Sequence, residues 1–278
     1  ELSTYDLLTT ILLFLLGTVG IVLLSMAISV IGSIILFHGF TLTLRGEDLQ
    51  RSYGLLTRRT ASIPRRRIQV LQVQEGLLRR LFGLAAIRAD TAGSPVQNGE
   101  QSGHDALLPI TRADEVEALL PVFFPNFGMA APEWRHVSQV AIRRGTFKGC
   151  AALLISMGIL ASFHGWASLW LLLFIPPIYL INVLNYRHLG YALSDEFFRT
   201  RRGWIKRSTH IVPISKIQSV VVHQNPFDRH HRVATLILDT AGQTYTGGSP
   251  RISNVAIEDA MELAHILSQR ASRRRLQW

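Results

Sequence analysis

The sequence predicts a membrane protein in which transmembrane α-helices alternate with two β-rich barrels, each closed by a C-terminal helix. Three observations predict this fold class. Two long stretches, 7–37 and 149–186, contain no Asp, Glu, Lys or Arg. The polar segments that follow them alternate apolar and polar residues with the period of β-strands. The second polar segment repeats the first at a constant spacing of 149 residues.

The composition of the 278-residue chain excludes an ordinary soluble domain. The chain is 48% hydrophobic and 17% charged, and its mean hydropathy is +0.23, whereas charged residues make up about a quarter of a typical soluble domain. The polar segments carry +5 in 38–148 and +7 in 187–278, and Glu1 and Asp6 reduce the net charge of the chain to +10. A single cysteine, Cys150, excludes an intramolecular disulfide and a cysteine-based zinc cluster.

The first uncharged stretch is expected to cross the membrane. As one helix, its 31 residues extend about 46 Å, against a hydrocarbon core of about 30 Å. A hairpin turning near Gly17 or Gly20 would leave arms of about 15 residues, so residues 7–37 can cross once or, less favourably, twice. Acidic residues precede the stretch and arginines follow it, which favours one crossing with the N-terminus outside. Because the chain does not begin with Met, we expect further sequence upstream of Glu1.

The second uncharged stretch is expected to form two transmembrane helices. Its 38 residues are interrupted by a polar and aromatic turn at 163–166, of the kind found at a bilayer interface. Basic residues flank both ends of the stretch, which places both ends on the cytoplasmic side. Pro176 and Pro177 predict a kink in the second of these helices.

An internal repeat organises the whole chain. When the chain is compared with itself at a shift of 149 residues and without gaps, 15 of the 50 positions from Leu44 to Gly93 are identical. The same shift aligns the membrane helix that ends near Asn185 with the one that ends near Leu36. The repeated unit is therefore a membrane helix followed by a polar domain.

Each polar domain is predicted to be a meander of strands followed by an amphipathic helix. The alternating runs 40–44, 68–73 and 235–239 predict strands, Gly54 and Gly203 predict hairpin turns, and 244–246 is expected to continue the second meander. The first closing helix is expected to begin near Thr111, with Asp114 in its first turn, and to run to Pro121. The second is expected to have Ser253 as its N-cap.

These elements predict five segments. They are a transmembrane helix region at 1–38, a first barrel domain at 39–128, a cytoplasmic linker at 129–146, a transmembrane helix pair at 147–186, and a second barrel domain with a basic tail at 187–278.

Several motifs resemble the bacterial pleckstrin-homology (PH)-like membrane proteins of the YdbS/YdbT type, and most closely the multi-domain YdbT-like members. The motifs lie in both repeats and together cover nearly the whole chain: Gly54–Arg59, Ile63–Gln69, Leu78–Gly83, Asp90–Gly93, Leu107–Ile110, Gly203–Arg207, Val212–Gln218 and Asp239–Gly242. His230–Arg232 departs from the corresponding Leu81–Gly83. The resemblance implies two PH-like barrels, each with a C-terminal helix, and it implies no settled activity.

Basic residues beside the predicted helices are the candidate lipid or partner contacts. They are Arg58, Arg59, Arg65, Arg66, Arg67, Lys206, Arg207 and Lys216, of which only Arg58 with Arg207 and Arg67 with Lys216 correspond between the two repeats. Each such residue near an anionic leaflet contributes about 1 kcal/mol of attraction. The simpler interpretation is that these residues set membrane topology, because positive charge fixes orientation whether or not it binds a specific lipid.

The sequence predicts no catalytic, cofactor or metal site. It has neither a Gly-x-Ser-x-Gly elbow nor a phosphate-binding glycine loop. His223, His230 and His231 lack ligand partners at metal-binding spacing. No nucleic-acid-binding motif accompanies the positive charge. The chain is therefore not expected to be an enzyme or to bind nucleic acid.

The predicted function is that of a membrane-anchored interaction or scaffold module, located in the bacterial inner membrane as a multi-pass protein with cytoplasmic PH-like domains. We expect an unknown protein partner, recognised through barrel loops or a barrel edge, and a homo-oligomer is possible. Two alternatives stay open. The domains could sense anionic lipid headgroups through the arginines, or the chain could be a subunit of an envelope-stress or transport complex.

Overall fold

The computed structural model describes residues 2–92, 106–125, 127–128, 132–242 and 249–275. The chain divides into two compact units, 1–64 and 65–278. This division falls inside the first repeat, between its third and fourth strands.

The first unit consists of one long helix and a three-stranded antiparallel sheet. Helix α1 (Leu2–Phe37) is continuous, so no hairpin forms at Gly17 or Gly20. Its segment Thr9–Phe37 is long and apolar enough to cross a membrane. The sheet has the order β1-β2-β3, formed by β1 (Thr41–Arg45), β2 (Asp48–Tyr53) and β3 (Arg59–Pro64).

The β2–β3 turn contacts the end of α1. The amide of Gly54 donates to the His38 carbonyl at 2.9 Å, and the amide of Leu55 donates to the Ile35 carbonyl at 3.0 Å. Gly54 has a φ of +115°, which strongly favours glycine. The predicted hairpin turn is therefore confirmed, and it holds the sheet against the last turn of the helix.

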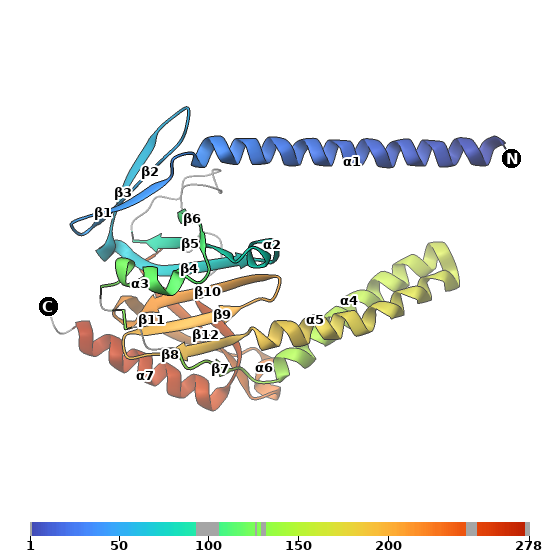
Figure 1. Ribbon diagram of the computed structural model, residues 1–278. Coiled ribbons are helices and arrows are strands. Elements are labelled where there is room, and N and C mark those ends of the chain that lie inside the picture. The colour runs from blue at the N-terminus through green and yellow to red at the C-terminus, as the bar shows by residue number, and fades with distance from the viewer. Residues whose placement is uncertain (1, 93–105, 126, 129–131, 243–248, 276–278) are drawn as a thin grey trace. The chain divides into compact units, whose positions relative to one another are not determined.

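A seven-stranded antiparallel sheet dominates the second unit (Figure 1). Its order is β6-β5-β4-β10-β9-β8-β7. The strands are β4 (Ile68–Gly76), β5 (Leu84–Thr91), β6 (Ala106–Arg112), β7 (Arg135–His136), β8 (Gly190–Leu193), β9 (Phe197–Arg202) and β10 (Lys206–Pro213).

Pairing between β4 and β10 joins the two repeats. Strand β4 belongs to the first repeat and β10 to the second, and they pair over six positions, including Leu71 with Ile211 and Val73 with Thr209. Both strands lie inside the sheet, so a further strand flanks the pair on each side. At the shift of 149 residues, β10 of the second repeat corresponds to β3 of the first. Strands β6, β5 and β4 of the first repeat are thus extended into a larger sheet by strands of the second repeat.

The second repeat also contributes a smaller antiparallel sheet and a closing helix. The sheet has the order β11-β12-β13, formed by β11 (Ile217–His223), β12 (Val233–Thr240) and β13 (Arg251–Ala256). Helix α7 (Ile257–Arg275) contacts β11, β12 and β13. A hydrophobic core joins β9, β10, β12 and α7 through buried side chains that include Phe198, Val212, Leu236 and Leu267.

A helical hairpin leaves this unit between the repeats. It comprises α4 (Val140–His164), a 3₁₀ segment (Gly165–Phe174) and α5 (Ile175–Arg187). The segment 140–187 is long and apolar enough to cross a membrane, and α4 contacts α5 along the hairpin. The predicted interruption is confirmed at Gly165, whose φ is +55°. The tandem prolines lie in the first turn of α5 rather than inside a helix, where proline is well tolerated.

Two glycines allow α4 and α5 to approach closely. A Cβ at Gly149 would lie 2.6 Å from Cγ2 of Ile178, and one at Gly145 would overlap the side chain of Asn182. The spacing of four residues matches the small-residue contacts that let membrane helices pack closely. Helix α4 begins at Val140, seven residues before the predicted boundary of the helix pair.

Both closing helices begin later than predicted. Thr111 lies in β6, and helix α3 (Val116–Phe123) has Glu115 as its N-cap. Ser253 lies in β13, and α7 begins at Ile257. In each case the preceding strand extends through the residue taken as a cap, because sheet pairing outweighs the local capping preference of Thr or Ser.

The strand predicted at 244–246 lies outside the described residues. Short helices α2 (Leu77–Leu81) and α6 (Pro226–His230) occupy matching turns in the two repeats.

Candidate interaction surface

The eight predicted basic contacts are divided between the two units. Arg58 immediately precedes β3 in the first unit, Arg59 is the first residue of that strand, and both are exposed. The remaining six lie in the second unit, on the 3₁₀ turn Arg65–Arg67 before β4, in β10, and on the matching turn Ile214–Lys216 before β11.

Lys216 links the two matching turns of the second unit. Its Nζ donates to the main-chain carbonyl of Arg66 at 2.9 Å, and Arg65 Nη1 donates to the carbonyl of Val122 at 3.4 Å. The side chains of Arg66 and Arg67 are exposed. Lys216 and Arg65 therefore have contacts within the protein, whereas Arg66 and Arg67 extend into the surroundings.

Arg207 is part of the junction between the repeats. Its Nη1 lies 3.4 Å from Oε2 of Glu75 on β4, and its Nη2 lies 3.1 Å from Nδ1 of His188. Burial, together with the charges of Arg207, Arg80 and Arg201, lowers the pKa of His188, which keeps the ring neutral beside these cations. Lys206, the neighbour of Arg207 and the first residue of β10, is exposed.

Arg199 is a structural cation that the sequence analysis did not single out. Its side chain is 3% exposed, and its Nη1 lies 3.0 Å from Oε1 of Glu117 on α3. The guanidinium carbon lies 4.8 Å from the centre of the Phe127 ring. Arg199 on β9 therefore connects the closing helix of the first repeat to the second repeat. A signal was present: Arg199 follows Phe197 by two positions, so both lie on one face of the strand.

Arg144 fastens the helical hairpin to the second repeat. Its Nη1 forms an ion pair with Asp228, whose side chain is 3% exposed, and lies 3.4 Å from Oδ1 of Asn254. Asp228 also forms a capping box with Asn225 at the start of α6. The sequence analysis treated the basic residues here only as determinants of topology, because their long-range partner is invisible in the sequence.

Strand β11 is an edge strand where its counterpart β4 is central. In the described part of the chain, β11 pairs with β12, whereas β4 lies between β5 and β10. Burial differs accordingly: Leu71, Gln72 and Val73 are buried, whereas Val221, the counterpart of Gln72, is 48% exposed. The stretch 220–223 thus presents the strand edge that corresponds to the edge of β4 with which β10 pairs.

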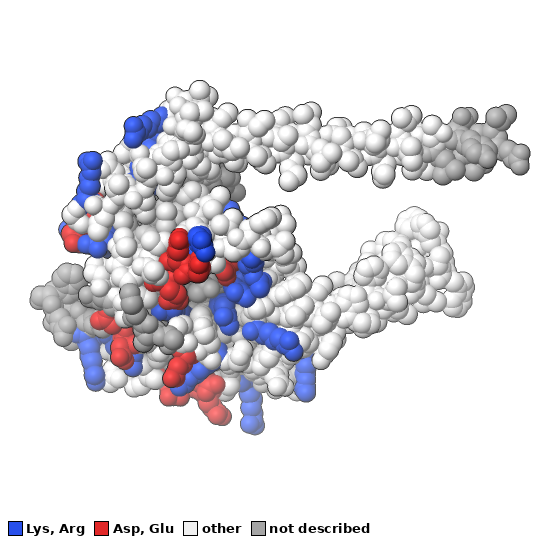
Figure 2. All heavy atoms as spheres, in the orientation of Figure 1, with Lys and Arg blue, Asp and Glu red and all other residues white. Residues whose placement is uncertain are grey.

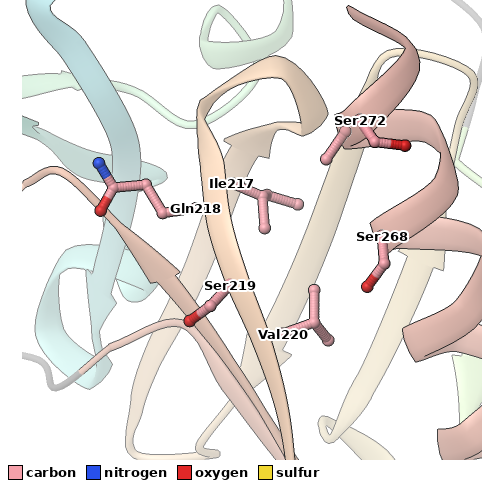
Figure 3. A pocket seen from close by; sticks show the side chains of 7 residues that line it. Ile217, Gln218, Ser219, Val220, Ser268 and Ser272 are labelled. Carbon is pink, nitrogen blue, oxygen red and sulfur yellow. The ribbon is translucent and has the colours of Figure 1, made fainter. Parts of the chain in front are cut away.

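A hollow of about 160 Å³ lies between the start of β11 and the C-terminal half of α7. Figure 3 shows Ile217 and Val220 pointing from the strand towards the helix, opposite Ser268 and Ser272, while Gln218 and Ser219 point away. Its lining contains no charged side chain. The hollow therefore lacks the cationic groups that an anionic headgroup requires.

Within the described ranges, no group of three or more His, Cys, Asp or Glu side chains could hold a metal ion. His230 and His231 contact each other, with ring centres 5.0 Å apart.

Comparison with known proteins identifies the family. The sequence pattern of the bacterial PH domain matches residues 10–121 and 139–271, one copy for each repeat. The chain is also 22% identical over 209 residues to a protein of Bacillus subtilis (strain 168) described as UPF0699 transmembrane protein YdbT. That alignment covers 75% of the chain and 42% of the relative, so the chain spans less than half of the relative's length. No solved structure matches. Both copies of the pattern together cover most of the sequence, and the chain belongs to the bacterial PH domain family.

Proposed function

We propose that the chain is a membrane-anchored scaffold that binds a protein partner by strand addition to β11. One observation carries the proposal: the fold already joins its two repeats by strand addition, at the pairing of β4 with β10. The counterpart of β4 in the second repeat is the edge strand β11. An edge strand with an exposed apolar side chain readily pairs with an extended segment of another chain.

The occupant we propose is an extended strand that resembles β10. In the first repeat, β10 pairs with the edge of β4 and covers Leu71 and Val73, which are buried. Their counterparts on β11, Val220 and Val222, are only half-buried and pack against the core. A strand with alternating apolar residues would complete their burial while its main chain pairs with β11. Two membrane attachments would hold the domain at the membrane surface. This raises the effective concentration of the domain for a partner at the same membrane and favours binding there.

The proposed location is the bacterial inner membrane, with several crossings and both PH-like domains in the cytoplasm. The description of the matched relative as a transmembrane protein supports membrane attachment. Arg143, Arg144 and Lys148 at one end of the hairpin and Arg187 at the other support a cytoplasmic position for both of its ends. The proposed role is binding rather than catalysis, because the matched family is a domain family with no enzymatic description.

Sensing of anionic lipid headgroups is the second candidate function. The exposure of Arg66 and Arg67 supports it. A headgroup pocket shared by both repeats is less well supported, because Arg207 and Lys216 in the second repeat bind groups within the protein. A role as a subunit of an envelope-stress or transport complex is compatible with the scaffold proposal and would be defined by the partner.

Affinity purification from native membranes in mild detergent tests the proposal. The full-length protein is compared with Val221→Lys, which places a charge on the β11 edge, and with Met261→Lys, a matched change at an exposed residue of α7. An Arg66→Ala/Arg67→Ala variant tests the lipid alternative and leaves the internal contact of Arg65 in place.

The scaffold proposal predicts a stoichiometric protein partner that is retained by the wild type, Met261→Lys and the arginine variant, and is lost with Val221→Lys. A partner bound equally by all four would contradict strand addition at β11. If the wild type instead retains only anionic lipid, and the arginine variant loses it, the protein is a headgroup sensor and the scaffold proposal is wrong. Binding of that lipid to vesicles should then weaken as salt rises.

A further inference from the structure

Large apolar side chains are exposed at one end of the second unit. Leu78 on α2 is 72% exposed and Phe227 on α6 is 75% exposed, and Leu81, Phe82 and Ile205 are also exposed. Figure 1 shows α2, α6 and the turn between β9 and β10 at the end from which the α4–α5 hairpin leaves. Apolar groups clustered on one face of a protein indicate contact with another apolar phase or with a partner.

The two repeats share exposed apolar residues at two equivalent positions. Leu78 and Phe227 are 149 residues apart, and so are Leu56 and Ile205 at the tips of the β2–β3 and β9–β10 turns. Leu56, in the first unit, is exposed as well. Only a minority of residues are identical between the repeats, yet both keep an exposed apolar side chain at the hairpin tip and in the short helix.

Polar contacts tie all three apolar segments of the second unit to the base of the hairpin or to one another. The amide of Trp204 in the β9–β10 turn donates to Oδ1 of Asn185 on α5 at 3.0 Å. Arg80 on α2 donates from Nη1 to the Trp204 carbonyl at 2.9 Å. The ion pair between Arg144 and Asp228 joins α6 to α4. The exposed side chains are therefore held beside the point where the hairpin would enter the bilayer.

The charged side chains around these segments also fit a position where the hairpin would enter the bilayer. Figure 2 shows Lys and Arg side chains gathered where the hairpin meets the sheets, and no charge along the rest of the hairpin. Arg79 on α2 and Lys206 at the start of β10 flank the exposed apolar residues, while Glu75 and Asp228 are paired with arginines. Apolar side chains flanked by unpaired cations are typical of segments that lie at the headgroup–acyl boundary.

We propose that α2, α6 and the β9–β10 turn insert their apolar side chains into the headgroup–acyl boundary of the bilayer that the hairpin crosses. The domain would then rest on the membrane through three shallow contacts in addition to its helices. This contact differs from recognition of anionic headgroups, because it depends on burial of leucine and phenylalanine side chains rather than on lipid charge. It is also separate from the β11 edge.

Spin labels in nanodiscs test the proposal with the full chain. The single cysteine, Cys150, is replaced by alanine, and a nitroxide is attached at Leu78→Cys, at Phe227→Cys, or at Ser272→Cys as an exposed control on the C-terminal part of α7. The three labelled side chains are exposed, so labelling them leaves the packing of the core intact. Collision rates with oxygen, which concentrates in the bilayer, and with a water-soluble nickel chelate are measured in phosphatidylcholine alone and with one quarter phosphatidylglycerol.

The proposal predicts that labels at Leu78 and Phe227 meet oxygen several-fold more often, and the nickel chelate several-fold less often, than the label at Ser272, in both lipid compositions. Equal water accessibility at the three sites would overturn it. Shielding of Leu78 and Phe227 from both reagents would also overturn it, because it would show that protein covers them. Insertion only with phosphatidylglycerol would overturn the claim that apolar burial holds these segments at the membrane.

Discussion

Replacing Arg144 with alanine is expected to destabilise the protein by about 3 kcal/mol, because it leaves the Asp228 carboxylate nearly buried without its ion-pair partner. The loss should fall at the low end of the range for broken buried pairs, since Asp228 still accepts from the amide of Asn225 at 3.0 Å. It should appear as a lower midpoint of thermal unfolding in detergent and as easier proteolysis near α6.

The adjacent Arg143→Ala is the matched control. Arg143 is exposed, so its removal should change the free energy of unfolding by less than about 0.5 kcal/mol. The double variant Arg144→Ala/Asp228→Asn should recover part of the lost stability, because no buried charge then remains unpaired. Equal effects of Arg143→Ala and Arg144→Ala would show that the ion pair does not hold the hairpin to the domain.

His210 should make the free energy of unfolding depend on pH between about 6.5 and about 4. The ring lies in β10, opposite Gln72 of β4, and is 3% exposed. Burial, assisted by the charge of Arg202, lowers the pKa of His210 from 6.5 to about 4. Above pH 6.5 the ring is neutral in both the folded and the unfolded chain, so its contribution does not change.

As the pH falls from 6.5 towards 4, the unfolded chain takes up a proton that the folded chain resists, and stability is lost. The full loss is about 3 kcal/mol and is reached below the folded pKa. Unfolding measured at several pH values should show this loss in the wild type and in His223→Leu, which changes an exposed histidine. It should be reduced in His210→Leu, whose side chain does not titrate. An unchanged pH dependence in His210→Leu would assign the effect to other groups.

The helices and the repeat were predictable because their signals are local or exact. The uncharged stretches identified α1 and the hairpin, and the constant shift of 149 residues identified the two copies. The family assignment followed from short motifs and is confirmed by the match to both repeats. Element ends were less predictable: Thr111 and Ser253 both have the side chain of a helix cap, yet both lie in strands.

The pairing of β4 with β10 could not be predicted, because β3 and β10 are related by the repeat and share the same pattern of residues. A local pattern cannot decide which of two similar strands pairs with β4, since that depends on contacts 130 to 140 positions apart in the sequence. The same limit affected the candidate site. Lys216, Arg207 and Arg144 were interpreted from their charge, whereas their roles are set by distant partners.

The central claim is that the two repeats form one sheet through β4 and β10, and that β11 presents the equivalent edge. Hydrogen exchange of the full chain in lipid nanodiscs tests this most directly. Amides of β4 and β10 should exchange slowly and together, and amides at 220–223 on β11 should exchange faster than their counterparts on β4. Rapid exchange in β10 while β9 stays protected would contradict the shared sheet and, with it, the model of partner binding at β11.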